Sequence, residues 1–215
     1  DMHRFVDQKV LVVERFDRRW AADGSWLMRD HQEDFCQALG VPSALKYEAD
    51  GGPGVAQCFD LLRRTLDPER DRSTFMRALV VYWLLAAIDG HGKNFSLALL
   101  PGGRCRLTKL YDVLSAYPIA ARRQLSLRKV KMAMAALGKS KHFEWHGIAP
   151  RHWGSTAASV GLPLPTVEAV LHDVITRGAG AVEAVHAALP RSFPDAVATP
   201  ILDGVTKALA RLARG

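Results

Sequence analysis

Hydrophobic and polar positions along the chain predict a short strand region followed by a long helical region. Residues 10–16 (VLVVERF) form a nearly continuous apolar run, which is typical of a buried strand. Few strand-like runs follow it, so we expect it to pair with upstream sequence or with something outside this chain. Asp30 and Glu33 form a capping-box pattern, which predicts a helix over residues 31–39 that Gly40 would end.

A strongly apolar helix is expected near the centre of the chain. It would begin after a cap at Ser73 or Thr74 and continue to residue 88, and its apolar positions on nearly all sides place it in the core. Residues 95–100 and 104–110 are strand patterns around a Pro-Gly-Gly turn, which predicts a hairpin. Further helices are expected at residues 55–66, 130–137, 150–160, 166–176, 179–189 and 193–212, with Pro163, Gly178 and Pro190 between them.

These elements predict a mostly α architecture with a small β-hairpin, α+β overall. The 215 residues suffice for one large domain, or for a large lobe and a small subdomain, with a real core. Apolar residues make up 48% and charged residues 24%, a globular composition. The longest apolar run, residues 78–88, is too short to cross a bilayer, so no membrane association is expected.

Charge and cysteine content indicate which partners and which cellular location suit the protein. The net charge of +7 suits acidic partners such as nucleotides, RNA or DNA, although a plain basic surface would give the same number. Cys36, Cys58 and Cys105 include no CxxC pair, and three cysteines in so long a chain argue against a disulfide framework. A reducing, cytoplasmic location is therefore expected.

Candidate chemistry is concentrated where the apolar helix ends. Residues 89–94 read DGHGKN, and a second acid, Asp112, follows the hairpin. Phosphoryl transfer needs a carboxylate to accept the proton of the attacking hydroxyl, and an amide oxygen and a further carboxylate to hold Mg²⁺. Asp89, Asn94 and Asp112 stand in the order and spacing that protein kinases use. The plainer alternative is that Asp89 caps a helix end and the other two are turn residues.

The residues around both acids resemble the HipA family of toxin kinases. Residues 89–96 (DGHGKNFS) and 110–118 (LYDVLSAYP) resemble that family's catalytic loop and metal-binding segment. Residues 14–18 (ERFDR) resemble the segment that joins its two kinase lobes, and residues 31–40 (HQEDFCQALG) resemble its first C-lobe helix. The resemblance continues through residues 131–137, 142–153 and 189–194.

The resemblance implies a role for each site residue. Asp89 would be the general base, and Lys93 would be the second catalytic residue beside it. Asn94 and Asp112 would hold Mg²⁺. Contacts to ATP would come from Glu14, Arg15, Phe16, His91, Gly92, Lys93, Asn94, Tyr111 and Asp112.

The fold that the resemblance implies is protein-kinase-like. Residues 1–20 would be the end of a β-rich N-lobe and the inter-lobe segment, and residues 21–215 a helical C-lobe. The implied protein is a serine/threonine-protein kinase toxin of a bacterial HipA/HipB-type toxin–antitoxin system. It would transfer the γ-phosphoryl group of ATP to a serine of glutamyl-tRNA synthetase or a related translation protein, inhibiting translation and promoting growth arrest and persistence. It would bind a HipB-like antitoxin and, through it, DNA.

Two departures from the family pattern matter. The family's phosphate-binding loop and ATP-pairing lysine have no counterpart, because only nine residues precede Val10. We therefore expect an N-lobe supplied in cis or in trans, and weak ATP binding with slight turnover by this chain alone. Lys109 stands where a small or apolar residue is expected. Two other functions stay open: a non-catalytic module that binds an antitoxin–DNA complex, and a small-molecule phosphotransferase with the same Asp-x4-Asn spacing.

Other polar groups have plainer interpretations. His142, His146 and His152 are close in sequence but lack a further fixed ligand, so packing or surface roles are preferred to a metal site. A basic stretch is expected to be a solvated face, or a contact for an acidic protein or nucleic-acid phosphates. Its residues are Arg122, Arg123, Arg128, Lys129 and Lys131.

Overall fold

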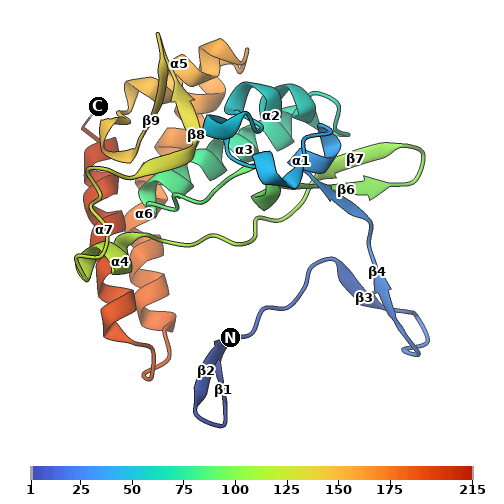
Figure 1. The fold of residues 1–215 in the computed structure, drawn as a ribbon, viewed down its shortest axis with the longest axis horizontal. Coiled ribbons are helices and arrows are strands. Elements are labelled where there is room, and N and C mark those ends of the chain that lie inside the picture. Colours follow the sequence, from blue (N-terminus) through green and yellow to red (C-terminus); the bar gives the residue numbers. More distant parts are fainter. Residues whose placement is uncertain (1, 215) are drawn as a thin grey trace.

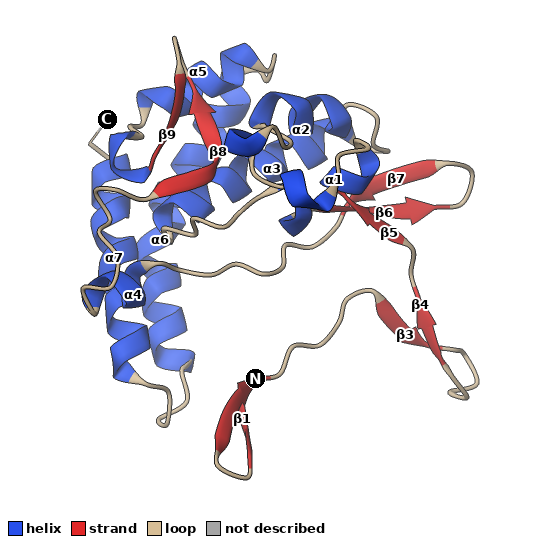
Figure 2. Ribbon diagram, in the orientation of Figure 1, coloured by secondary structure: helices blue, strands red, loops and turns tan. Residues whose placement is uncertain are grey.

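The computed structural model describes residues 2–214; Asp1 and Gly215, the outer ends of the two expected lobes, lie outside them. Helices gather on one side, and β-hairpins extend away from them as an N-terminal arm (Figure 1, Figure 2). The strands are β1 (Met2–Phe5), β2 (Gln8–Leu11), β3 (Arg18–Trp20), β4 (Leu27–Arg29), β5 (Gln32–Asp34), β6 (Ser96–Leu100), β7 (Arg104–Leu107), β8 (Lys131–Leu137) and β9 (Lys141–Glu144). The helices are α1 (Phe35–Ala38), α2 (Val55–Leu62), α3 (Pro68–Leu84), α4 (Tyr117–Ala121), α5 (Arg151–Ser159), α6 (Leu164–Ala188) and α7 (Asp195–Leu212), with 3-10 turns at Ser43–Leu45, Glu48–Asp50, Gly92–Asn94 and Trp145–Gly147.

The N-terminal arm consists of two antiparallel hairpins, β1–β2 and β3–β4. The buried strand expected over residues 10–16 is wrong: strand structure ends at Leu11, and Leu11 and Val13 are 72% and 68% exposed. The run is apolar, but the structure places it away from the core. The Lys9 ammonium donates a hydrogen bond to the Ser192 carbonyl at 3.1 Å, which ties the first hairpin to the loop between α6 and α7.

The helix expected over residues 31–39 begins later than its sequence suggests. The residues of β5 pair with β6 instead, in a three-stranded sheet of order β5–β6–β7. The capping box forms at the end of β5: the Asp34 carboxylate accepts from the Gln37 backbone N–H at 2.9 Å, and the Gln37 side chain accepts from the Asp34 N–H at 3.0 Å. The capping box predicted at Asp30 and Glu33 is therefore wrong. It forms instead at Asp34 and Gln37, because residues 32–34 pair with β6 as a strand.

The central helix and the hairpin after it were predicted correctly in kind. α3 begins earlier than expected, with Asp67 as its cap and Pro68 in its first turn, a favourable place for proline. Its buried side chains, with Trp83, Tyr82 and Phe75 the largest, form the centre of the core. β6 and β7 form the hairpin expected around residues 101–103.

The helix expected over residues 130–137 is a strand, β8, which pairs with β9. Its Met-Ala-Met-Ala sequence favours a helix intrinsically, but contacts with distant parts of the chain decide otherwise. The Ala133 N–H donates to the Ile88 carbonyl at 3.1 Å, and the Ala135 N–H donates to the Glu48 carboxylate at 2.8 Å. β8 thereby packs behind the turn that follows α3.

The C-terminal part is helical, as expected, with one difference. Residues 166–176 and 179–189 were expected to be two helices separated at Gly178, whereas α6 runs through both. A Cβ at Gly178 would lie 2.5 Å from Leu209 of α7, so glycine here allows the two helices to approach closely. α5 and α7 lie where helices were expected.

The described residues form a mixed α/β structure with helices and four small antiparallel sheets. This is more β structure than the single hairpin that we expected. None of the helices in residues 2–214 is both long and apolar enough to cross a membrane.

Candidate functional site

The sharp turn after α3 positions the first candidate catalytic residue. Ala86 is fully buried and adopts the left-handed conformation, with φ of 47°, which costs a non-glycine residue about 1–2 kcal/mol. Hydrogen bonds hold this strained turn: the Ala116 N–H donates to the Ala86 carbonyl at 3.0 Å, and the Ser115 hydroxyl donates to the Leu85 carbonyl at 2.7 Å. Asp89 follows this turn, three residues after Ala86, at the edge of the core.

Asp89 keeps part of its carboxylate accessible. Its side chain is 45% exposed, and one oxygen, Oδ1, accepts a hydrogen bond from the Tyr47 hydroxyl at 2.6 Å. His91 Nε2 lies 3.9 Å from the same oxygen. The other oxygen, Oδ2, accepts no hydrogen bond from residues 2–214, so it can accept a proton.

His91 and Gly92 form the tightly packed part of the loop. Burial is the main cause that lowers the pKa of His91, with Lys46 adding to it and Asp89 opposing it. The neutral imidazole is therefore favoured at neutral pH. A Cβ at Gly92 would lie 2.9 Å from the ring of Pro53 and 3.0 Å from the Cys36 sulfur, so glycine is needed for the close approach.

Lys93 is joined to the start of α1 through its side chain. Its ammonium forms an ion pair with the Asp34 carboxylate at 2.7 Å, and the hydrogen bond to Asp34 raises the pKa of Lys93. Its carbonyl accepts a hydrogen bond from the Tyr111 hydroxyl at 2.8 Å. The loop of residues 89–94 is thus joined to the N-cap of α1 and to the segment before Asp112.

Asn94 and Asp112 lie side by side. The Asn94 amide donates to the Asp112 carboxylate at 2.8 Å, and its oxygen accepts from the His91 backbone N–H at 3.2 Å. Asn94 is buried, whereas Asp112 is exposed and adopts a positive φ of 57°. Oxygen ligands from one carboxylate and one amide fit Mg²⁺, which usually takes one or two protein carboxylates together with substrate phosphates. Within residues 2–214, no three His, Cys, Asp or Glu side chains are grouped as a metal site of their own.

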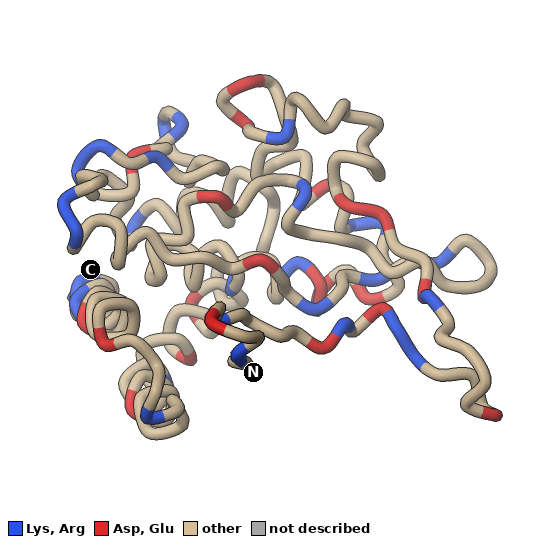
Figure 3. Tube along the Cα trace, turned by 60° about the horizontal axis from the view of Figure 1, so that its bottom comes forward, with Lys and Arg blue, Asp and Glu red and all other residues tan. Residues whose placement is uncertain are grey.

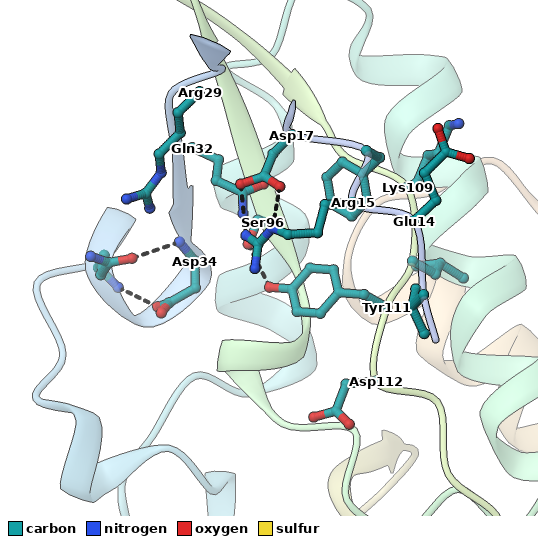
Figure 4. A pocket seen from close by; sticks show the side chains of 14 residues that line it. Glu14, Arg15, Asp17, Arg29, Gln32, Asp34, Ser96, Lys109, Tyr111 and Asp112 are labelled. Carbon is teal, nitrogen blue, oxygen red and sulfur yellow. Dashed lines mark hydrogen bonds and ion pairs between the residues drawn. The ribbon is translucent and has the colours of Figure 1, made fainter. Parts of the chain in front are cut away.

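A cleft of about 810 Å³ opens beside Asp112, bordered by the arm, by β5 and the start of α1, and by residues 109–112 (Figure 4). Its size falls in the range of small-molecule sites. The Phe16 and Tyr111 rings lie 6.0 Å apart within it, and the Tyr111 hydroxyl shares a 2.5 Å hydrogen bond with Ser96. The cleft is lined by Val13, Glu14, Arg15, Phe16, Asp17, Arg29, Gln32, Asp34, Gln37, Ser96, Lys109, Leu110, Tyr111 and Asp112.

Arg15 forms an ion pair with Asp17, a buried acid two positions later in the sequence. Its guanidinium makes two 2.8 Å hydrogen bonds to Asp17, whose side chain is 4% exposed, and Arg18 adds a third at 2.6 Å. The hydrogen bond from Arg15 lowers the pKa of Asp17 although burial opposes it. This cluster fixes the shape of residues 15–18 beside the cleft.

Some of the expected site residues line the cleft, and the others lie on an adjoining loop. Glu14, Arg15, Phe16, Tyr111 and Asp112 line the cleft. Asp89, His91, Gly92, Lys93 and Asn94 form the adjoining loop, which meets the cleft lining through the Asn94–Asp112 and Lys93–Asp34 contacts.

Sequence reasoning missed three residues of this region. Tyr47 lies 42 positions before Asp89 and has no local pattern that marks it. Asp17 was not singled out, although its position between two arginines is a visible signal. Asp34 could have been found as a cap, since Gln37 stands three residues after it.

Other polar groups remain apart from the cleft. His142 and His152 stack with their ring centroids 3.9 Å apart, which is a packing arrangement. The basic stretch of residues 122–131 has its cations exposed, and the tube view shows how lysine and arginine are distributed over the chain (Figure 3).

Comparison with known proteins identifies relatives along most of the chain. The family model described as "HipA-like C-terminal domain" matches residues 1–182. The curated protein named "Putative kinase Y4mE", from Sinorhizobium fredii, is 39% identical over 178 residues, covering 81% of this chain and 39% of that protein. The "Serine/threonine-protein kinase toxin HipA" of Shewanella oneidensis is 32% identical over 126 residues, covering 54% of this chain and 29% of that protein.

A solved structure resembles the whole chain. It is a chain of the Shewanella oneidensis complex of HipA, HipB and operator DNA, with a TM-score of 0.83 and 27% sequence identity. The match covers 100% of this chain and 50% of that one. This chain therefore spans half or less of the length of each of these relatives.

Proposed function

The chain belongs to the family of HipA-like C-terminal domains, and from this premise we propose that it is the catalytic-loop lobe of an ATP-dependent serine/threonine-protein kinase toxin. The observation that carries the proposal is the Asn94–Asp112 hydrogen bond of 2.8 Å. It joins the catalytic loop to the metal-binding segment at the edge of a cleft large enough for a nucleotide. A kinase-like C-lobe uses these two segments in the same way.

Asp89 acts as the general base. Its partly exposed carboxylate orients a serine hydroxyl of the protein substrate and accepts its proton as the hydroxyl oxygen attacks the γ-phosphorus. The loop around it is packed closely, so the carboxylate is held in place before the substrate arrives. Lys93 positions the loop through its ion pair with Asp34, and its positive charge would offset negative charge that develops on the phosphoryl group.

The cleft binds the nucleotide. Phe16 and Tyr111 supply aromatic surface for adenine, and the backbone around Glu14 and Arg15 borders the same side. Asn94 and Asp112 would hold Mg²⁺, which when bound neutralises phosphate charge. The Asn94 amide and the Asp112 carboxylate meet at the end of the cleft where the phosphates would lie.

An N-lobe, supplied in cis or in trans, completes the kinase. Several apolar side chains of the arm are exposed in a way that suits a partner surface: Trp20 is 65%, Leu27 is 48% and Phe5 is 62% exposed. Covering them would remove apolar surface from water, worth roughly 25 cal/mol per Å². The lobe described here then supplies the base and the metal ligands, and the N-lobe supplies the remaining contacts to the phosphates.

The proposed partners, substrate and cellular effect are those that the family resemblance implies. The proposed partners are a HipB-like antitoxin and, through the antitoxin complex, DNA, because a similar chain is part of the Shewanella oneidensis HipA, HipB and operator DNA complex. The proposed substrate is glutamyl-tRNA synthetase or a related translation protein in the bacterial cytoplasm. Its phosphorylation would inhibit translation and promote growth arrest and persistence.

A non-catalytic module within an antitoxin–DNA complex is the second candidate. The same likeness to a DNA-bound complex favours it, and it requires no phosphotransfer. A small-molecule phosphotransferase is a weaker alternative, since the family match extends far beyond the loop that such enzymes share.

Phosphotransfer with matched variants tests the proposal. Radiolabelled Mg²⁺-ATP is added to glutamyl-tRNA synthetase together with the chain and its N-lobe, using wild type and Asp89→Asn. Label on a serine of the synthetase with wild type, lost by a factor of at least about 100 in Asp89→Asn, supports the proposal. Binding of a HipB-like protein without nucleotide binding or label transfer would favour the module instead. Label on a small alcohol but on no protein would favour the phosphotransferase.

A further inference from the structure

Tyr47 makes the shortest contact to the candidate base. Its hydroxyl donates to Asp89 Oδ1 at 2.6 Å, across 42 residues of sequence. The carboxylate side chain is 45% exposed, so without this bond it could rotate between several orientations in water. One oxygen is therefore fixed by a neutral donor, while the other accepts no hydrogen bond within residues 2–214.

Tyr47 makes further contacts through its ring and its backbone carbonyl. Its ring meets the His91 ring edge-on, with centroids 5.1 Å apart, and the Lys46 ammonium lies 5.1 Å from the Tyr47 ring centroid. Its carbonyl accepts from the Gly52 N–H at 2.8 Å. A Cβ at Gly52 would lie 2.7 Å from that carbonyl oxygen, so only glycine allows the turn to close beneath Tyr47.

The residue after Tyr47 anchors the same turn to the rigid part of the fold. The Glu48 side chain is 3% exposed, accepts from the Ala135 N–H of β8 at 2.8 Å and pairs with the Lys141 ammonium at 2.8 Å. β8 also donates to the Ile88 carbonyl, one residue before Asp89. The turn that carries Tyr47 and the turn that carries Asp89 are thus attached to the same strand.

We propose that Tyr47 is the positioning residue of the base: it fixes Asp89 through Oδ1 so that Oδ2 faces the hydroxyl of the substrate. The inference rests on the proposed kinase function. In the step it serves, the serine proton passes to Asp89 Oδ2, and the serine oxygen forms a bond to the γ-phosphorus. The bond from that phosphorus to the bridging oxygen breaks, and ADP leaves with the electron pair.

The chemistry of the phenol suits a fixed donor. The hydrogen bond to Asp89 is the main cause that raises the pKa of Tyr47 to about 12, with burial and the Asp89 charge adding to it. Tyr47 therefore keeps its proton throughout the neutral range and donates permanently. It does not exchange a proton with the substrate.

Removal of one hydroxyl tests the role in the kinase assembled with its N-lobe. Tyr47→Phe is compared with Tyr82→Phe, a matched control in the core, because the Tyr82 hydroxyl has no hydrogen-bond partner among residues 2–214. We expect Tyr47→Phe to lower kcat by about 10- to 100-fold with the KM for ATP unchanged, as for a misplaced reacting group. Tyr82→Phe is expected to retain wild-type kcat and KM.

A second readout does not depend on activity. In protein carrying isotope-labelled tyrosine, the ring resonance of Tyr47, assigned by its loss in Tyr47→Phe, is expected to shift in Asp89→Asn. The Tyr82 resonance should stay in place. An unmoved Tyr47 resonance would show that the two side chains do not interact in solution and would overturn the inference.

The two experiments separate the inference from the function on which it rests. If wild type transfers no phosphoryl group to any protein, the kinase proposal fails, whatever the resonance shows. If wild type is active and Tyr47→Phe has the same kcat, Tyr47 has no positioning role. A higher kcat in Tyr47→Phe would also overturn the inference, because the phenol would then be competing with the substrate hydroxyl for Asp89.

Discussion

The Asn94 amide donates a 2.8 Å hydrogen bond to the Asp112 carboxylate, joining two loops that a β-hairpin separates in sequence. The contact depends on that hairpin, because β6 and β7 return the chain to the side of the loop at residues 89–94. It also depends on the positive φ of Asp112, which turns the backbone at the cleft edge. Aspartate tolerates this conformation better than most residues.

Replacing Asp112 by asparagine should weaken the proposed Mg²⁺ binding while keeping the fold. In Asp112→Asn the amide oxygen can still accept the hydrogen bond from Asn94, but the negative charge that attracts a cation is lost. We expect the Mg²⁺ concentration for half-maximal nucleotide binding to rise by more than about tenfold, with an unchanged thermal midpoint. Titration calorimetry with Mg²⁺-nucleotide measures this in the protein with its N-lobe. Unchanged Mg²⁺ dependence would exclude Asp112 as a ligand.

Asp34 should contribute to stability mainly as a helix cap. Asp34→Ala removes the acceptor for the Gln37 N–H and the partner of Lys93, so we expect the free energy of unfolding to fall by about 1–2 kcal/mol. Asp34→Asn keeps an oxygen that can accept the capping bond and should cost less. Denaturant unfolding of both variants measures the two losses in the free energy of unfolding. Equal losses would assign the effect to the ion pair with Lys93 instead of the cap.

Two glycines of α6 should respond in opposite directions to the same substitution. A Cβ at Gly180 meets nothing within 4 Å, so Gly180→Ala should stabilise the protein by about 0.5–1 kcal/mol through helix propensity. A Cβ at Gly178 would lie 2.5 Å from the Leu209 side chain, and the resulting overpacking should cost about 1–3 kcal/mol. Thermal unfolding of the pair measures both, and stabilisation by Gly178→Ala would contradict the close approach of α6 and α7.

Stability should fall as the solution is acidified below about pH 6.5. Burial is the first cause that lowers the pKa of both His91 and His152, so the folded state takes up protons at lower pH than the unfolded chain does. The unfolded state then binds more protons, and the free energy of unfolding declines from about pH 6.5 towards pH 5. Above that window these histidines contribute a constant amount.

Denaturant midpoints across this pH range check the expectation. His152→Gln retains a group that can accept from the Ala149 N–H but does not titrate, so its midpoint should change less with pH than the wild-type midpoint. The same slope in both proteins would exclude His152 as a source of the pH dependence.

Local sequence patterns predicted those elements whose structure is decided locally. The Pro-Gly-Gly turn at residues 101–103 marked the β6–β7 hairpin, and the apolar spacing of α3, α5 and α7 marked three helices. β8 was mistaken for a helix because its hydrogen bonds go to Ile88, Glu48 and β9, none of which its own sequence reveals. Tertiary contacts outweighed its helix propensity.

The candidate site was likewise predictable only where its residues lie close together in the sequence. The spacing from Asp89 to Asn94, and the acid after the hairpin, could be predicted because both lie on short continuous segments. The partners that hold these residues could not: Tyr47 reaches Asp89 from 42 positions away, and Asp34 reaches Lys93 from 59 positions away. Contacts between distant segments follow from packing, which no local pattern encodes.

The cleft is lined by segments that lie far apart in the sequence. One wall comes from the arm near Phe16, and the other from the segment at Tyr111, with a ring separation of 6.0 Å between them. A nucleotide bound in the proposed site would contact both walls and would therefore stabilise the arm in its position beside Tyr111. At a ligand concentration of 100 times Kd this contribution amounts to about 2.7 kcal/mol, so saturation with nucleotide should govern how firmly the arm is docked.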